Sequence, residues 1–180
     1  MKPKVYLAGQ ITQNWWRNAI CNNEDNRTPC VDVDVGDRDD YFNKEYDNGN
    51  CIITGPHAVG CDHSCFHDSA HASMEGCSGG IEYTHKDIAY ACCHQIEKSD
   101  IVFAYIENED AFGTFAEVGY AHGLDKFVFI LFKNKELADK LWFMSQMAVD
   151  CHILQNDTSY AAINSAFESC LSEWDEVGFY

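Results

Sequence analysis

Basic residues are scarce in this sequence. Its 180 residues include 12 Lys and Arg against 29 Asp and Glu, which gives a formal net charge of −17. Nucleic-acid backbones and anionic membrane surfaces are bound through clustered Lys and Arg side chains. The charge balance therefore excludes nucleic acid and membranes as partners and favours a small-molecule ligand.

Long apolar runs are also missing. No stretch approaches the roughly 20 apolar residues that cross a membrane. The chain passes from Met1-Lys2-Pro3-Lys4 into a short strand without the apolar segment of a signal peptide. We therefore expect a cytoplasmic protein whose 10 cysteines are mostly reduced. With 46% hydrophobic residues and no shift in composition, residues 1–180 are expected to form a single domain.

The stretch from Ser99 to Phe132 carries the clearest structural pattern. Residues 101–106 and 127–132 are apolar, β-branched and aromatic runs, which are typical of strands buried on both faces. Between them lie an acidic loop and a helix of small residues that Gly123 would end. This order predicts a βαβ unit. In parallel sheets the ligand crevice lies beyond the carboxyl ends of the strands, so Asn108 to Glu117 falls at the expected site.

The remaining segments complete an α/β prediction. Further strands are expected at 5–10, 51–56 and 151–154, with a half-exposed edge strand at 31–35. Helices are expected at 14–20, 83–98 and 135–148, and a last helix follows a cap at Asp157-Thr158. We predict a flavodoxin-like (Rossmann-like), doubly wound, five-stranded parallel sheet with helices on both faces.

Glu117 has two roles open to it on spacing alone. Thr114-Phe115-Ala116-Glu117 matches a capping box, in which the threonine caps the helix and the glutamate bonds back to the cap's amide. Alternatively, the glutamate lies in the first turn of the helix and faces the ligand crevice.

A resemblance favours the second role. The pattern D-x-x-G-T-x-x-E-x-G-Y-A, which runs from Asp110 to Ala121 after a strand ending in acidic residues, resembles the nucleoside 2-deoxyribosyltransferase family. The resemblance implies that Glu117 is the nucleophile that attacks the anomeric carbon of a deoxyribose. It also implies a homo-oligomer with shared sites.

The first strand carries a second part of the resemblance. Val5 to Gln10 is similar to the family's opening strand, and Gln10 stands where the family usually has proline. The resemblance implies that Tyr6 and Gly9 line the nucleoside pocket. Gln10 is expected to face the ligand, and one of the adjacent Trp15 and Trp16 is expected to border the pocket, because neighbouring helical positions point in different directions.

Cleavage of an N-glycosidic bond needs a second carboxyl group to protonate the departing base. Asp110, in the acidic loop, is the first candidate. The resemblance also implies an aspartate on the helix at 83–98. Asp87 is the one present, although Cys92 and Cys93 lie nearer the family's usual position, and a capping box at Thr84 to Asp87 is the alternative.

The acidic loop and the start of the helix after it supply the other expected ligand contacts. Asn108 lies within it, and Gly113 and Thr114 at the helix start are expected to bind a 5′-phosphate or 5′-hydroxyl through backbone amides.

An insertion loop at about 55–80 is rich in cysteine and histidine. Cys61, His63, Cys65 and His67 alternate along it, and thiolates and imidazoles are the ligands that zinc takes. A structural zinc site and a hydrogen-bonded loop that covers the pocket both remain open, and the proposed chemistry requires no cofactor.

The sequence thus predicts an enzyme acting on a nucleoside or nucleotide, either an N-glycosyl (deoxyribosyl) transferase or a 5′-monophosphate nucleoside N-glycosidase. The alternatives are a TIR-like module that cleaves NAD or senses nucleotides, and a non-enzymatic protein that binds nucleotide or zinc.

Overall fold

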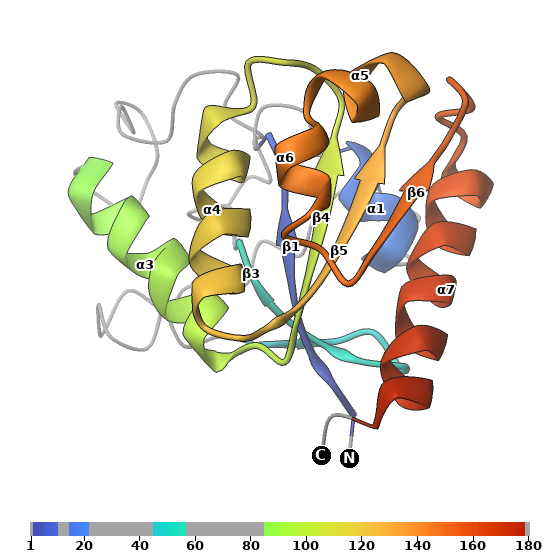
Figure 1. Cartoon of the computed structure of the whole chain (residues 1–180). Coiled ribbons are helices and arrows are strands. Elements are labelled where there is room, and N and C mark those ends of the chain that lie inside the picture. Colours follow the sequence, from blue (N-terminus) through green and yellow to red (C-terminus); the bar gives the residue numbers. More distant parts are fainter. Residues whose placement is uncertain (1, 11–14, 22–44, 57–84, 179–180) are drawn as a thin grey trace, which may run out of the picture.

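The computed structural model describes residues 2–10, 15–21, 45–56 and 85–178 (Figure 1). Its strands are β1 (Lys4–Ala8), β2 (Tyr46–Asp47), β3 (Ile52–Gly55), β4 (Ile101–Ile106), β5 (Phe127–Phe132) and β6 (Asp150–Ile153). Its helices are α1 (Trp15–Cys21), α3 (His85–Lys98), α4 (Phe112–Gly123), α5 (Lys135–Lys140), α6 (Trp142–Ser145) and α7 (Tyr160–Val177). No helix in these ranges is long and apolar enough to cross a membrane.

The strands form one mixed sheet of six in the order β2-β3-β1-β4-β5-β6. Strands β3, β1, β4, β5 and β6 pair in parallel, and β2 pairs antiparallel with β3. The α/β class with a largely parallel sheet is therefore confirmed. Strand β2 was not among the predicted strands, and the predicted strand at 31–35 lies outside the described residues.

The centre of the sheet follows the two apolar runs. Strands β4 and β5 have the predicted bounds, and all six residues of each are buried. Their register pairs Ile101 with Phe127 and Ile106 with Phe132, so the two strands end together at one edge. Each fully buried large apolar side chain contributes about 1.5–3 kcal/mol to the free energy of unfolding.

Helices cover both faces of this sheet (Figure 1). On one face, alternate strand residues such as Phe103 and Phe129 pack with α1 and α7. On the other face, Tyr6, Val102 and Ile130 pack with α3, α4, α5 and α6. Because side chains alternate along a strand, each of the central strands β1, β4 and β5 contributes to both cores.

The helix ends differ from the predictions in two places. The single helix expected at 135–148 is two helices, α5 and α6, that meet at Leu141. The cap of the last helix is Ser159, whose side chain accepts a hydrogen bond from the Ala162 amide at 3.2 Å, and not Asp157-Thr158. Asp157 instead accepts the Ser159 amide at 3.1 Å.

Candidate functional site

A tyrosine and a glutamate meet between β1 and α4. Tyr6 is fully buried in β1, and its hydroxyl donates a hydrogen bond of 2.6 Å to Oε1 of Glu117 on α4. The two residues are 111 positions apart in the chain. The fold therefore aims the glutamate inward, toward the sheet, and a buried phenol holds its carboxylate in one orientation.

Of the two roles left open for Glu117, the capping alternative is wrong. Helix α4 begins at Phe112, and its N-cap is Ala111, which makes no side-chain capping bond. Thr114 is therefore inside the helix, where it is buried, and Glu117 lies in the second turn rather than the first. A capping box needs the threonine at the cap itself, so the pattern at Thr114 to Glu117 has no cap to bond.

Burial dominates the electrostatics of Glu117. Loss of hydration raises the pKa of its carboxyl to about 7, although the Tyr6 hydrogen bond, the positive charge of Arg17 and the Cys92 thiol oppose the rise. Burial, and then the negative charge of Glu117, raise the pKa of Tyr6 well above its ordinary value. Tyr6 therefore stays protonated as a donor, while Glu117 changes charge near neutral pH.

Cys92 on α3 is the third side chain at this position. It contributes to the hydrogen bonding of both Tyr6 and Glu117. Burial, followed by the charge of Glu117, raises the pKa of its thiol to about 12, so the group is a neutral thiol at physiological pH. A protonated thiol supplies a hydrogen-bond donor and no nucleophile.

Arg17 forms hydrogen bonds with the backbone at the carboxyl end of β1. Its guanidinium donates to the carbonyl oxygens of Leu7 and Gly9 at 2.9 Å each and of Gln10 at 3.3 Å. It also lies over the Trp16 ring, 4.4 Å from the centroid, and only 1% of the residue is exposed. Arg17 was not among the predicted site residues. The signal available was a rare basic residue close behind the first strand.

Gly9 is required by the close approach of α1. A Cβ added at Gly9 would lie 2.7 Å from a ring carbon of Trp16, which is closer than real side chains approach. Trp16 is buried and packs on Tyr105, with ring centroids 5.5 Å apart. Gly9 therefore serves packing at the end of β1. The side chain of Trp15 lies outside the described residues.

Gln10 and Asn108 bind each other. The Gln10 amide donates to Asn108 Oδ1 at 3.2 Å, and the Asn108 amide donates to Gln10 Oε1 at 2.9 Å. This pair joins the segments that follow the neighbouring strands β1 and β4. Both were predicted to contact substrate. The structure brings them together at the expected edge, where their reciprocal bonds use one N–H of each amide and leave the second N–H for a ligand.

Lysine side chains form ion pairs with the acidic loop that follows β4. Glu107 pairs with Lys133 at 3.1 Å, and Glu109 pairs with Lys140 at 2.6 Å. Asp110 is exposed, and its backbone amide donates to Asn108 Oδ1 at 3.0 Å. Of the loop carboxylates, Asp110 is the one with no ion pair to another described residue.

Gly113 is exposed near the start of α4, with no described atom within 4 Å of where a Cβ would be. Thr114 beside it is buried. The backbone of α3 contains Asp87, but the side chain of Asp87 lies outside the described residues. The same holds for the predicted zinc ligands Cys61, His63, Cys65 and His67.

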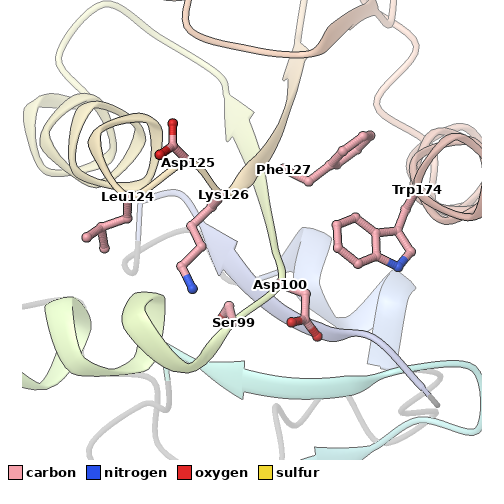
Figure 2. A pocket seen from close by; sticks show the side chains of 7 residues that line it. All are labelled: Ser99, Asp100, Leu124, Asp125, Lys126, Phe127 and Trp174. Atoms are coloured by element: carbon pink, nitrogen blue, oxygen red, sulfur yellow. The ribbon is translucent and has the colours of Figure 1, made fainter. Parts of the chain in front are cut away.

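A hollow of about 270 Å³ lies at the opposite, amino end of the strands (Figure 2). Asp100, Lys126 and Trp174 are among the residues that line it. The Asp100 carboxylate accepts the Lys4 amide at 2.8 Å, and the Lys126 ammonium donates to the Glu97 carbonyl at 2.7 Å. Because protein groups already engage these polar side chains, and ligands of parallel sheets bind at the carboxyl end, we place the candidate site at Glu117.

Comparisons with known proteins add no assignment. No protein-family model matches the chain, and no curated protein matches it either.

Proposed function

We propose that this protein cleaves the N-glycosidic bond of a (deoxy)nucleoside or nucleotide and transfers the sugar to another base or to water. In this proposal the fold is flavodoxin-like and doubly wound, and the protein is a cytoplasmic homo-oligomer. The observation that carries the proposal is the orientation of Glu117: its carboxylate points inward, bonded to Tyr6, and does not cap its own helix.

The proposed chemistry has two steps. In the first, the ionised Glu117 attacks the anomeric carbon; a carbon–oxygen ester bond forms, the carbon–nitrogen bond breaks, and a proton from Asp110 passes to the departing base. In the second, an acceptor base or a water molecule attacks the same carbon, gives its proton to Asp110 and releases Glu117. Because Asp110 is exposed, a bound nucleoside must cover it for this proton transfer.

Tyr6 has a positioning role in this scheme. A buried carboxylate that is free to rotate would seldom meet the anomeric carbon at the angle required for attack. The 2.6 Å bond from Tyr6 fixes one oxygen of Glu117 and thereby the orientation of the carboxylate toward the sugar. Gln10 and Asn108, at the ends of β1 and β4, and the backbone at Gly113 and Thr114 are the proposed contacts to the rest of the ligand.

The test is an incubation of the full chain with a deoxynucleoside and a free acceptor base, with a nucleoside 5′-monophosphate, or with NAD. Products are resolved by chromatography. Base exchange supports the transferase, free base with sugar phosphate supports the glycosidase, and nicotinamide release supports the TIR-like alternative.

The variants decide whether Glu117 is responsible. We expect Glu117→Ala and Glu117→Gln to lower turnover by at least about 10³-fold, because a covalent nucleophile is removed. Glu97→Gln is the matched control, since Glu97 also accepts a tyrosine hydroxyl, from Tyr120 at 2.5 Å, but is exposed. If wild type and both Glu117 variants, folded by circular dichroism, act alike on every substrate, the enzyme proposal is wrong.

A further inference from the structure

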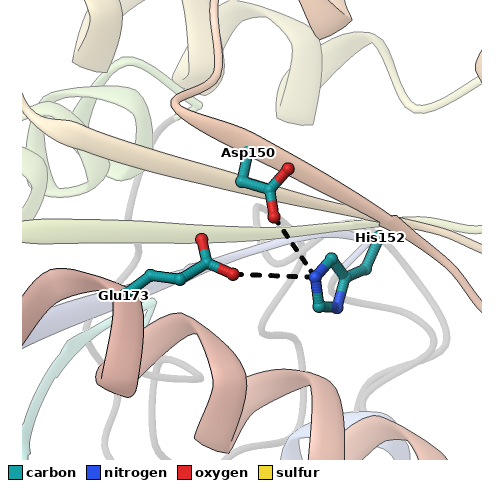
Figure 3. Close-up of side chains that lie close together, drawn as sticks. All are labelled: Asp150, His152 and Glu173. Carbon is teal, nitrogen blue, oxygen red and sulfur yellow. Dashed lines mark ion pairs between the residues drawn. The ribbon is translucent and has the colours of Figure 1, made fainter. Parts of the chain in front are cut away.

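A histidine and two carboxylates converge on the face of the sheet away from Glu117 (Figure 3). Asp150 and His152 belong to β6, and Glu173 belongs to α7. One ligand atom from each residue lies within 4.8 Å of the other two. The cluster joins the last strand in the order of the described sheet to the C-terminal helix, and it takes no part in the site proposed above.

The distances suit ligands of one ion. Nε2 of His152 is 3.2 Å from Oδ2 of Asp150 and 3.7 Å from Oε1 of Glu173. Nitrogen and oxygen ligands at about 2.0–2.2 Å from a metal lie roughly 3–3.5 Å from one another. The His152–Asp150 distance lies in this range, and the His152–Glu173 distance lies just above it.

The charges also call for a cation. Carboxylate oxygens of Asp150 and Glu173 lie within 4.8 Å of each other, and Glu176 adds a further negative charge nearby. One imidazole brings at most a single positive charge to these acids. Two ionised carboxylates in contact repel each other unless a proton or a cation lies between them.

The cluster is positioned but still accessible. The His152 ring packs edge-on against Phe129, with centroids 4.8 Å apart, which fixes the direction of its nitrogen. The side chains of Asp150, His152 and Glu173 are 44%, 36% and 30% exposed. Solvent can therefore reach an ion at this position and complete its coordination with water.

We propose that Asp150, His152 and Glu173 bind one divalent first-row transition-metal ion, of the zinc or manganese type, which clamps α7 onto β6. The imidazole ligand argues against Ca²⁺ and Mg²⁺, which prefer oxygen ligands alone. The clamp is structural, and it operates whether or not Glu117 is catalytic.

The test must separate this site from the cysteine-rich part of the chain. Mn²⁺ is the probe for binding, because it prefers oxygen and nitrogen ligands to thiolates. We expect electron paramagnetic resonance titration of the full chain to show one equivalent of bound Mn²⁺. His152→Ala should weaken that binding by at least about tenfold. His94→Ala is the matched control, because His94 pairs with a single carboxylate, Glu97, at 3.5 Å.

Thermal unfolding gives a second readout. Added Mn²⁺ or Zn²⁺ should raise the unfolding midpoint of the wild type and of His94→Ala, but raise it less in His152→Ala, because an ion that binds only the folded state stabilises it. If His152→Ala does not fold, Glu173→Gln replaces it, since the amide keeps the size of the side chain. Mn²⁺ binding of unchanged affinity in a folded variant, or no binding by wild type, would mean that the cluster makes ion pairs only and would overturn the proposal.

Discussion

Two tyrosine–glutamate pairs in this protein make the same hydrogen bond with opposite electrostatic results. In one, Tyr6 donates to the half-buried Glu117 at 2.6 Å; in the other, Tyr120 donates to the exposed Glu97 at 2.5 Å. Burial raises the pKa of Glu117 to about 7, whereas the Tyr120 hydrogen bond lowers the pKa of Glu97 below its ordinary value.

The difference shows that burial decides the character of Glu117. A hydrogen bond to a carboxylate favours the charged form, and it does so in both pairs. Only in the Tyr6–Glu117 pair does the loss of hydration raise the pKa by more than the hydrogen bond lowers it. A carboxylate that loses its hydration, and that is held by one donor, is a better candidate for attack on a sugar than a solvated surface acid.

The largest expected effect concerns stability. A pKa of about 7 for Glu117 in the folded state exceeds its ordinary value of 4.5, so ionising this group costs stability as pH rises through that range. We expect Glu117→Gln, which carries no charge, to be more stable than wild type by about 3 kcal/mol at pH 8 and by close to zero at pH 4. Urea unfolding at both pH values measures the difference.

For the Tyr120–Glu97 pair we expect a stability change of the opposite sign. The lowered pKa of Glu97 means that its ionised form stabilises the folded state above the unfolded pKa and that this contribution is lost in acid. Glu97→Gln should therefore be slightly less stable than wild type at pH 8. A stabilisation of the same size in both variants would show that the two environments do not differ.

The next effect is on the pH dependence of turnover. A nucleophilic Glu117 must be ionised. On a substrate whose leaving group needs no proton from Asp110, kcat/KM should therefore rise with pH through about 7 and level off above it. At pH 5 the value should be about a hundredfold below the plateau. Initial rates on that substrate between pH 5 and 9 give the profile, and Glu97→Gln should leave it unchanged. A profile that is flat across this range is incompatible with a Glu117 nucleophile of raised pKa.

The smallest expected effect is a difference in kcat/KM between the Tyr6→Phe and Tyr120→Phe variants. Tyr6→Phe removes the bond that orients Glu117, so we expect kcat/KM to fall by about tenfold, since hydrogen bonds to charged groups contribute about 1.5–3 kcal/mol. The rising limb of the pH profile should also move to higher pH, because this bond lowers the pKa of Glu117. Tyr120→Phe should change neither kcat/KM nor the pH of the rising limb. Equal losses in the two variants would show that the Tyr6–Glu117 pair has no special role.

How far the sequence predicts this structure depends on whether a signal is local. Continuous apolar runs placed β4 and β5 with correct bounds, because a strand buried on both faces must be apolar at every position. The pattern Thr114-x-x-Glu117 was ambiguous, because the same residues fit both a capping box and a catalytic site. The ambiguity ended only with the position of the helix start at Phe112.

Contacts between distant segments were beyond the sequence patterns. The reciprocal bonds of Gln10 and Asn108, 98 positions apart, depend on β1 and β4 lying side by side. The burial of Arg17 depends on three carbonyl groups at the end of β1 that accept its hydrogen bonds. The break at Leu141 interrupts a pattern that reads as one continuous helix. Each feature depends on tertiary contacts. Helical and strand periodicity describe one segment at a time and do not predict such contacts.

The most direct test of the central role of Glu117 is the capture of its sugar ester. The full chain is mixed with a nucleoside that it cleaves, or with a 2′-fluoro analogue that slows hydrolysis of the ester, quenched in acid and digested for mass spectrometry. We predict that the peptide containing Glu117 gains the mass of the sugar, and that Glu97→Gln gives the same adduct whereas Glu117→Gln gives none. An adduct on a different residue, or an unmodified Glu117 peptide in a sample quenched while free base is still being released, would contradict the account.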